Sequence, residues 1–354
     1  MMLDKILAKA VEIDASDILI IAGLPVSYKI NGQISRENSP RLLPEDTRMI
    51  VEEIYAKAGG RNMDKLTVTG DDDFSFSVPG LSRFRVNALK QRGSLGVIIR
   101  VVTFHLPDRH KLGIPDIVME FASYTKGMVL ITGTAGSGKT TTLACIINEI
   151  NMTRNTHIIT IEDPIEFLHQ HQHSVVTQRE ISTDTVSYDV ALRAALRESP
   201  DIILLGEMRD PETIRAAVTA AETGHLVIST LHTMGAANTV DRIIDAFPPE
   251  QQYQIRTQLS QVLEGVVSQQ LITATDGSLV PAFEVMLANS AVRNMIREAK
   301  SYQLDSTISS SGGGMISMDQ SLLQLVKSGR VSERQALLKA VNPEWLHKRL
   351  DALR

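Results

Sequence analysis

One ten-residue stretch has the composition of a phosphate-binding loop. It reads GTAGSGKTTT, from Gly133 to Thr142, and contains three glycines, a lysine and four threonines. Its first eight residues fit the pattern G-x-x-x-x-G-K-[ST], with Gly133, Gly138, Lys139 and Thr140 in the required places. The apolar segment MVLIT precedes it, and apolar residues recur at helical spacing after it. A strand, a glycine-rich turn and a helix in this order predict a nucleotide-binding P-loop rather than an ordinary polar turn.

Each part of this loop has an expected role in binding ATP. Glycines let the backbone wrap closely with its N–H groups inward, and the following helix directs the positive end of its dipole at the anion. We expect Lys139 to reach the β and γ phosphates and the Thr140 hydroxyl to ligate Mg²⁺. Thr141 and Thr142 are interpreted first as residues that start the helix. The predicted nucleotide-binding residues are Gly133, Thr134, Ala135, Gly136, Ser137, Gly138, Lys139, Thr140 and Thr141.

Polar side chains follow three further apolar segments. HIITI runs into Glu162 and Asp163, DIILL is followed after one glycine by Glu207, and LVISTL runs into His232. Strands that alternate with helices predict a mostly parallel sheet, in which these ends share one edge with the P-loop. Glu207 is predicted to orient or deprotonate the attacking water. We expect Glu162 and Asp163 to hold Mg²⁺ through water or to tune the site, and His232 to contact the γ phosphate or relay its state.

The remaining histidines give weaker signals. His225 precedes LVISTL and is predicted to be functional, although a lone histidine is more often a core or surface residue. His169, His171 and His173 alternate as on a strand and could bind a metal. No cysteine lies among them, so we favour a surface strand or loop.

Three arginines of the N-terminal region are candidates for the charge stabilisation that phosphoryl transfer needs. Arg83 and Arg85 alternate onto one face of the strand SRFRVNALKQ, and Arg100 follows on a later strand. An arginine is often supplied by a neighbouring subunit to the γ phosphate. Each alone reads as a surface residue, but as a group they are predicted to reach the site of a neighbouring subunit.

The elements that must position these residues fall into two predicted domains. Residues 1–105 read as a small α/β domain, residues 106–116 as a linker or linker-like crossing, and residues 117–354 as a P-loop domain. From about residue 236 the pattern looks helical. Within it, residues 309–314 read as a flexible turn, and Ser317 with Gln320 suggests a capping box that starts a helix.

Composition bounds the class of protein. The chain has 354 residues, of which 43% are hydrophobic and 22% charged, values ordinary for a globular protein of two domains. The net charge of −5 and 4% aromatic content argue against a nucleic-acid-binding surface. Cys145 is the one cysteine and is interpreted as a buried helix residue in a reducing compartment. No apolar run approaches the ~20 residues that cross a bilayer, so membrane association is expected only through partners.

Four segments resemble, in order and spacing, the motifs of the secretion-type ATPases that drive type IV pili and type II secretion. Their Walker A, Asp-box, Walker B and His-box are similar to GTAGSGKT, ITIEDPIEFLH, LRAALRESPDIILLGEMRD and AAETGHLVISTLHT. The first domain and the C-terminal part also resemble the family, in ASDILIIAGLPVSYKINGQI, GLSRFRVNALKQRG and AVRNMIREAK. The short chain and single cysteine resemble the pilus retraction branch, because assembly and secretion ATPases usually carry a longer N-terminal region and a four-cysteine loop.

The resemblance implies an α/β fold, with a PAS-like N-terminal domain and a RecA-like ATPase core that ends in a helical C-terminal region. It implies a homo-hexameric ring that hydrolyses Mg²⁺-ATP between subunits, at the cytoplasmic face of the inner membrane. The expected partners are a pilus platform protein of that membrane and the pilus machinery. It also implies that Glu162 is the Asp-box acid, Glu207 the catalytic glutamate, and His225 with His232 the His-box pair. Ala299 stands where the family frequently has glycine.

Three alternative functions remain at this level. An assembly or secretion motor of the same family would share all four motifs. A RecA-like nucleic-acid translocase would need a basic and aromatic stripe along a strand. A nucleotide-gated scaffold would bind ATP without turnover.

Overall fold

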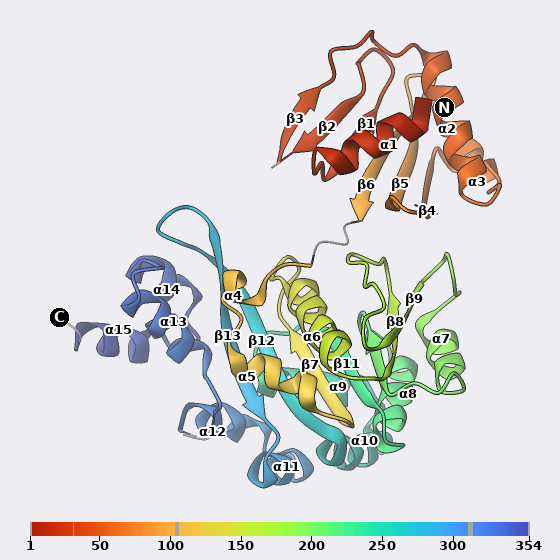
Figure 1. Ribbon diagram of the computed structural model, residues 1–354. Coiled ribbons are helices and arrows are strands. Elements are labelled where there is room, and N and C mark those ends of the chain that lie inside the picture. Colours follow the sequence, from red (N-terminus) through yellow and green to blue (C-terminus); the bar gives the residue numbers. More distant parts are fainter. Residues whose placement is uncertain (1, 31, 103–105, 311–313, 353–354) are drawn as a thin grey trace. The chain divides into compact units, whose positions relative to one another are not determined.

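The computed structural model describes residues 2–30, 32–102, 106–310 and 314–352. The chain divides into two compact units (Figure 1). The first comprises Met1–His105 together with Ile165–His169, and the second comprises Leu106–Pro164 and Gln170–Arg354. The sequence predicts residues 165–169 as part of the second domain, whereas the contacts group them with the first unit. The segment predicted as a linker carries the short helix α4 (Arg109–Leu112), and Ile114 after it is buried in the core of the second unit.

The first unit is an antiparallel sheet with helices packed on one face. The strand order is β3-β2-β1-β6-β5-β4. The strands are β1 (Asp17–Ile20), β2 (Ser27–Ile30), β3 (Gln33–Arg36), β4 (Asp71–Val78), β5 (Ser82–Gln91) and β6 (Ser94–Val102). The helices are α1 (Met2–Glu12), α2 (Pro44–Lys57) and α3 (Asp64–Thr69). Alternate strand residues such as Phe84, Val86 and Ile99 face the helices and form one core with Leu7 and Ile54.

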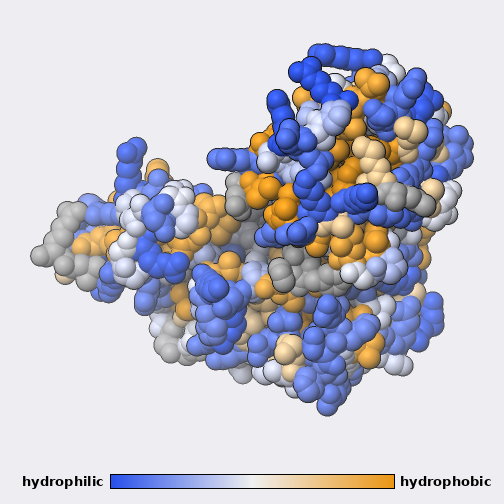
Figure 2. Space-filling model, turned by 45° about the horizontal axis from the view of Figure 1, so that its top comes forward, coloured by the Kyte–Doolittle hydropathy of each residue, from blue (hydrophilic) through white to orange (hydrophobic). Residues whose placement is uncertain are grey.

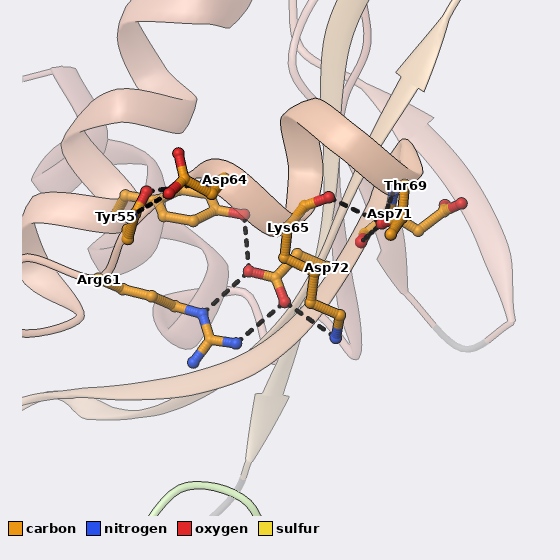
Figure 3. Close-up of polar contacts among 8 residues, drawn as sticks. Tyr55, Arg61, Asp64, Lys65, Thr69, Asp71 and Asp72 are labelled. Carbon is orange, nitrogen blue, oxygen red and sulfur yellow. Dashed lines mark hydrogen bonds and ion pairs between the residues drawn. The ribbon is translucent and has the colours of Figure 1, made fainter.

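A buried carboxylate joins α2, the loop after it and β4 in this unit (Figure 3). Asp72 is 1% exposed and accepts hydrogen bonds from the Tyr55 hydroxyl at 2.9 Å and from Arg61 through both oxygens at 2.9 and 3.0 Å. Lys65 of α3 forms an ion pair with it at 3.2 Å. Burial alone would raise the pKa of Asp72, but these donors outweigh burial and lower it. The network therefore ties the helices to the sheet through a charged group.

The second unit is a mixed sheet with helices on both faces. The strand order is β13-β12-β7-β11-β10-β8-β9. The strands are β7 (Gly127–Thr132), β8 (His157–Glu162), β9 (Val175–Glu180), β10 (Ile202–Leu205), β11 (Leu226–Leu231), β12 (Leu263–Thr273) and β13 (Leu279–Leu287). All neighbours pair in parallel except β12 with β13. Helical crossovers join most of the successive parallel strands, whereas β8 and β9 are joined by a segment without a helix.

The buried strands of this sheet pack against two sets of helices. Val129 and Ile131 of β7 face α5 (Asp116–Met119), the 3₁₀ turn η1 (Glu120–Ser123) and α6 (Lys139–Thr153). Met128 and Leu130 face the opposite set. That set is α7 (Tyr188–Ala195), α8 (Pro211–Glu222), α9 (Ala236–Asp245), α10 (Pro249–Val262) and α11 (Ser290–Arg297). Cys145 of α6 is buried as expected, and burial raises the pKa of its thiol to about 11.

The expectation that the chain is helical from about residue 236 is wrong for β12 and β13. These strands form a long antiparallel pair that continues the sheet beyond β7. The helices after them are α12 (Leu304–Ser310), α13 (Met318–Lys327), α14 (Glu333–Lys339) and α15 (Pro343–Asp351), with a 3₁₀ turn η2 (Ser301–Gln303). The capping box at the start of α13 is confirmed. Residues 311–313 of the expected flexible turn lie outside the described residues.

Hydrophilic side chains cover most of the face displayed in Figure 2, with apolar residues between them. None of the described helices combines the length and apolar character that a membrane span requires.

Candidate nucleotide-binding site

The P-loop lies between β7 and α6, as its sequence predicts. Gly133 and Gly138 adopt φ angles of 143° and 88°, which side chains disfavour. The α6 helix begins at Lys139, directly after the loop. The Lys139 side chain is 8% exposed, and its ammonium donates hydrogen bonds to the carbonyl oxygens of Gly133 and Thr134 at 2.8 and 2.9 Å. Lys139 thus spans the loop from inside, so that its charge lies where phosphate oxygens would accept the same donors.

A glutamine from β12 packs against the P-loop and the first turn of α6. Gln269 is 3% exposed, and its side-chain oxygen accepts a hydrogen bond of 2.7 Å from the Thr142 hydroxyl. A Cβ atom at Gly133 would lie 2.3 Å from the Gln269 carbonyl oxygen, and one at Gly138 would lie 2.8 Å from its side-chain nitrogen. Close contact with the β12 backbone therefore requires glycine at 133, whereas at 138 the positive φ is the main requirement.

The polar strand ends meet at the edge that carries the P-loop. In the strand register, Leu231 of β11 pairs with Thr132 of β7, the residue before the P-loop. Leu205 of β10 pairs with Ser229 of β11 and with Ile161 of β8. Strands lie about 4.8 Å apart, which places the end of β10 about 10 Å and that of β8 about 14 Å from the end of β7. The structure therefore brings the P-loop, His232, Glu207 and Glu162 to one edge, as predicted.

Glu207 is a buried acid at this edge. It is 8% exposed, and one oxygen lies 3.3 Å from Nε2 of His232. The other oxygen lies 2.6 Å from the guanidinium of Arg209, which sequence analysis did not single out. Hydrogen bonding to Glu207 raises the pKa of Arg209. A carboxylate between an arginine and a histidine can exchange one of these contacts for a water molecule and accept its proton.

Glu162 ends β8 at the same edge, and Asp163 follows it. Glu162 is half-buried and accepts hydrogen bonds from Thr160 at 2.6 Å and from Gln178 of β9 at 3.2 Å. Asp163 is exposed. Burial, with the charges of Glu207, Asp163 and Glu162, raises the pKa of the neighbouring Tyr188. These carboxylates make the edge acidic and suited to a hard cation such as Mg²⁺.

His225 does not join this group. It precedes β11, whose 6 residues span about 20 Å. Its ring nitrogen Nδ1 lies 2.9 Å from the carbonyl oxygen of Ala220, at the end of α8. The structure thus places His225 and His232 at opposite edges of the sheet.

The three candidate arginines lie in the first unit on the sheet face opposite its helices. Arg85 of β5 pairs with Arg100 of β6 in the strand register. Arg100 also forms an ion pair with Asp17 at 3.1 Å, and Arg83 donates a long hydrogen bond of 3.4 Å to Ser77. The sequence predicts that Arg83 and Arg85 share one face, and the strand register adds Arg100 to that face.

The other histidine predictions concern loops. His171 and His173 are exposed before β9, in the surface segment that sequence analysis favoured. His169 is mostly buried, and burial lowers its pKa to about 4.

Among the described residues, Glu333, His347 and Asp351 come close enough to share a cation. Each ring nitrogen of His347 faces a different one of these carboxylates, at 3.6 Å from Glu333 and 3.4 Å from Asp351.

A parallel sheet that ends in a P-loop, with a catalytic-type glutamate two strands away, defines a RecA-like P-loop nucleotide-binding protein. Comparison with known proteins identifies its group. The chain belongs to the type II/IV secretion system protein family, whose model matches residues 1–331. The resemblance seen in the motifs is confirmed, as is the α/β fold with a RecA-like core.

Three relatives match most of the chain. The type IV pilus retraction ATPase PilT of Pseudomonas aeruginosa is 43% identical over 341 residues, which cover 96% of this chain and 98% of that protein. A twitching motility protein of Neisseria gonorrhoeae is 44% identical over 89% of this chain and 84% of its own length. A crystal structure of the pilus retraction motor PilT with bound ADP superposes with a TM-score of 0.88 at 44% identity, and covers 98% of this chain and 99% of that one.

Proposed function

We propose that this chain is an ATP-hydrolysing motor that powers type IV pilus retraction, and that it acts as a homo-hexameric ring. The observation that carries the proposal is the meeting of Lys139, Glu207 and His232 at one sheet edge. The retraction ATPases that match this chain over nearly its whole length support the task. The pilus platform protein of the inner membrane is the proposed partner, approached from the cytoplasm.

The site performs phosphoryl transfer mainly by positioning charge. Lys139 exchanges its two loop carbonyls for phosphate oxygens when ATP enters. Glu207 exchanges its Arg209 contact for the attacking water and accepts its proton, while His232 orients that carboxylate or the γ phosphate. Thr140, Glu162 and Asp163 are the residues that would hold Mg²⁺, which neutralises charge on the phosphate oxygens.

The test of this site is steady-state ATP hydrolysis by Lys139→Ala and Glu207→Gln. Loss of one group that acts in the transition state lowers kcat by about 100-fold or more. The Glu212→Gln variant removes a carboxylate from the first turn of α8 and serves as the control. Unchanged turnover in both site variants would contradict the assignment.

The ring is tested by ATP turnover against protein concentration, with light scattering on the same samples. Turnover that rises steeply as a six-subunit species forms supports sites shared between subunits. Full activity in the monomer would remove the role of the arginines in a neighbouring site.

The arginines are tested by Arg85→Ala, which is expected to keep nucleotide binding and lose hydrolysis. Mixing this variant with Glu207→Gln should restore part of the activity, because some interfaces then combine an intact arginine with an intact glutamate. No recovery at any mixing ratio would contradict action between subunits.

An assembly motor is the second candidate, because Ala299 replaces the frequent glycine in the segment associated with retraction. Loss of a retraction motor leaves surface pili in place or in excess, whereas loss of an assembly motor abolishes them. Counting pili on cells that lack the gene separates the two.

A further inference from the structure

Glu284 is a buried carboxylate in the middle of β13 that the proposed mechanism does not use. It is 6% exposed. Among the described residues, none of the Lys, Arg and His side chains forms an ion pair with it. Burial and the charges of Asp305 and Asp319 raise its pKa, while two backbone N–H groups lower it. A buried charge without a counter-ion is costly unless hydrogen bonds replace its hydration.

The donors to Glu284 are the first N–H groups of two helices. Ala236, the first residue of α9, donates from its backbone N–H to Oε1 of Glu284 at 2.8 Å. The backbone N–H of Met318, the first residue of α13, also lowers the pKa of this carboxylate. Negative charge is favoured at helix N-termini, because the first N–H groups lack partners within the helix. Glu284 therefore caps α9 and stabilises its charge near the start of α13.

The α9 helix depends on this external acceptor. Its N-cap residue is Gly235, which has a φ of 85° and no side chain to accept a hydrogen bond. The Gly235 N–H instead donates to the hydroxyl of Ser268 on β12 at 2.9 Å. Ser268 pairs with Glu284 across the two strands. The β12–β13 pair thus supplies the cap that the sequence of the helix itself lacks.

The capped residues end the short loop that begins at His232. The loop is bounded by β11, which ends at Leu231, and by α9, which begins at Ala236. One end of the loop is fixed by the sheet, and the Gly235 and Ala236 contacts anchor the other end to β12 and β13, beside the bonds from Thr233 and Met234 to α9. His232 in turn lies 3.3 Å from Glu207. A shift of the cap is therefore transmitted to the histidine beside the proposed catalytic carboxylate.

The other end of the connection reaches the C-terminal helices. Asp319 follows Met318 in α13 and accepts hydrogen bonds from the backbone N–H groups of Val341 and Asn342 at 2.8 and 2.9 Å. These residues precede α15. Glu284 thus lies between two hydrogen-bonded groups, the start of α9 on one side and the α13–α15 contact at Asp319 on the other.

We propose that Glu284 is a positioning residue that, by capping α9, holds the 232–235 loop and with it His232 in its working place. The inference rests on the proposed role of His232 in ATP hydrolysis. Glu284 touches neither the P-loop nor Lys139, so its effect belongs to turnover and not to nucleotide affinity.

The experiment measures ATP hydrolysis and ADP affinity of the full chain with Glu284→Gln. The amide keeps the size of the side chain, but it places an NH₂ group against one of the two N–H donors. We expect kcat to fall about tenfold, as for loss of one hydrogen bond to a buried charge, while ADP affinity changes less than about twofold. The matched control is Glu264→Gln, which removes a half-buried carboxylate at the N-terminal end of β12 that is paired with Arg293 at 2.9 Å. Its kcat should stay within about twofold of wild type.

A double variant decides whether Glu284 acts through His232. If it does, Glu284→Gln causes no further fall in kcat when His232 is already alanine. Independent, multiplying losses would overturn the inference. Ser268→Ala, which keeps the charge and loses only the Gly235 contact, should give a smaller fall with the same dependence on His232, and it replaces Glu284→Gln if that variant does not fold.

The two hypotheses fail differently. A normal kcat in His232→Ala overturns the assigned role of His232 and this inference with it. A low kcat in His232→Ala with a normal kcat in folded Glu284→Gln or Ser268→Ala overturns the inference alone. A control variant that loses as much activity as Glu284→Gln also overturns it, because the loss then reflects general weakening of the sheet.

Discussion

Replacing Gly133 by alanine tests how the P-loop is built, because an added side chain would meet close contacts at Gly133 but open space at Gly136 of the same loop. At Gly133 the backbone has a φ of 143°, and an added Cβ would lie 2.3 Å from the Gln269 carbonyl oxygen and 2.6 Å from the Ser137 hydroxyl. At Gly136 the φ is 74°, and an added Cβ meets nothing within 4 Å. Gly136→Ala is therefore the matched control.

The expected costs follow from these two environments. A conformation nearly reserved for glycine costs about 1–3 kcal/mol, and forcing extra volume against backbone adds about 1–3 kcal/mol. Gly133→Ala should then destabilise the second unit by about 4 kcal/mol. Gly136→Ala should cost about 1 kcal/mol, because only the left-handed backbone conformation disfavours the alanine. At about 2–4 °C per kcal/mol for a unit of this size, the melting temperature should fall by about 10 °C and about 3 °C.

Thermal unfolding without nucleotide is the assay, since the overlap is with the protein itself. ADP affinity, measured by calorimetry, should also fall about 100-fold or more in Gly133→Ala, because relief of the overlap moves the loop away from β12. Equal melting temperatures for the two variants would refute the reasoning, since contact with Gln269 and Ser137 is the main difference between the two sites.

Two further substitutions test features away from the proposed active site. Asp72→Asn should destabilise the first unit by about 2 kcal/mol, a value discounted because Arg61 and Lys65 are partly exposed. Because the folded pKa of Asp72 is lowered from 3.8, its contribution is present above that value and is lost as pH falls below it. Urea unfolding between pH 3 and 6 should show a gap between wild type and variant that closes at low pH, and a gap independent of pH would contradict the assignment. Ala299→Gly should stabilise the second unit by about 1 kcal/mol, because Ala299 has a φ of 60° directly after α11. A melting temperature that fell would mean that the positive φ is not maintained in solution.

The parts of the site that are formed by contiguous residues, or by residues directly after a strand, could be predicted from sequence. The P-loop is a contiguous motif, and Glu207 and His232 follow unbroken apolar strands whose direction places them at one edge. The same rule places His225 at the other edge, since it precedes its strand. Sequence spacing does not reveal that Arg209 folds back onto Glu207, because that contact depends on side-chain direction after the strand ends.

The β12 strand was missed for a specific reason. The α10 helix ends at Val262 and β12 begins at Leu263, so no glycine, proline or polar turn marks the change. The apolar residues of this region satisfy a helical pattern as well as an extended one. Without the strand, the support of the P-loop by Gln269 and the capping of α9 by Ser268 and Glu284 could not be anticipated.

The contact between Thr142 and Gln269 joins residues separated by 127 positions. During synthesis, strand β7, the loop and α6 leave the ribosome long before β12 does. The phosphate-binding loop therefore gains its contacts with β12 only when more than two thirds of the chain has emerged. A nascent chain that ends before residue 269 contains the whole P-loop motif but lacks the glutamine that supports it. We therefore expect the chain to bind nucleotide only late in synthesis, after β12 has paired with β7.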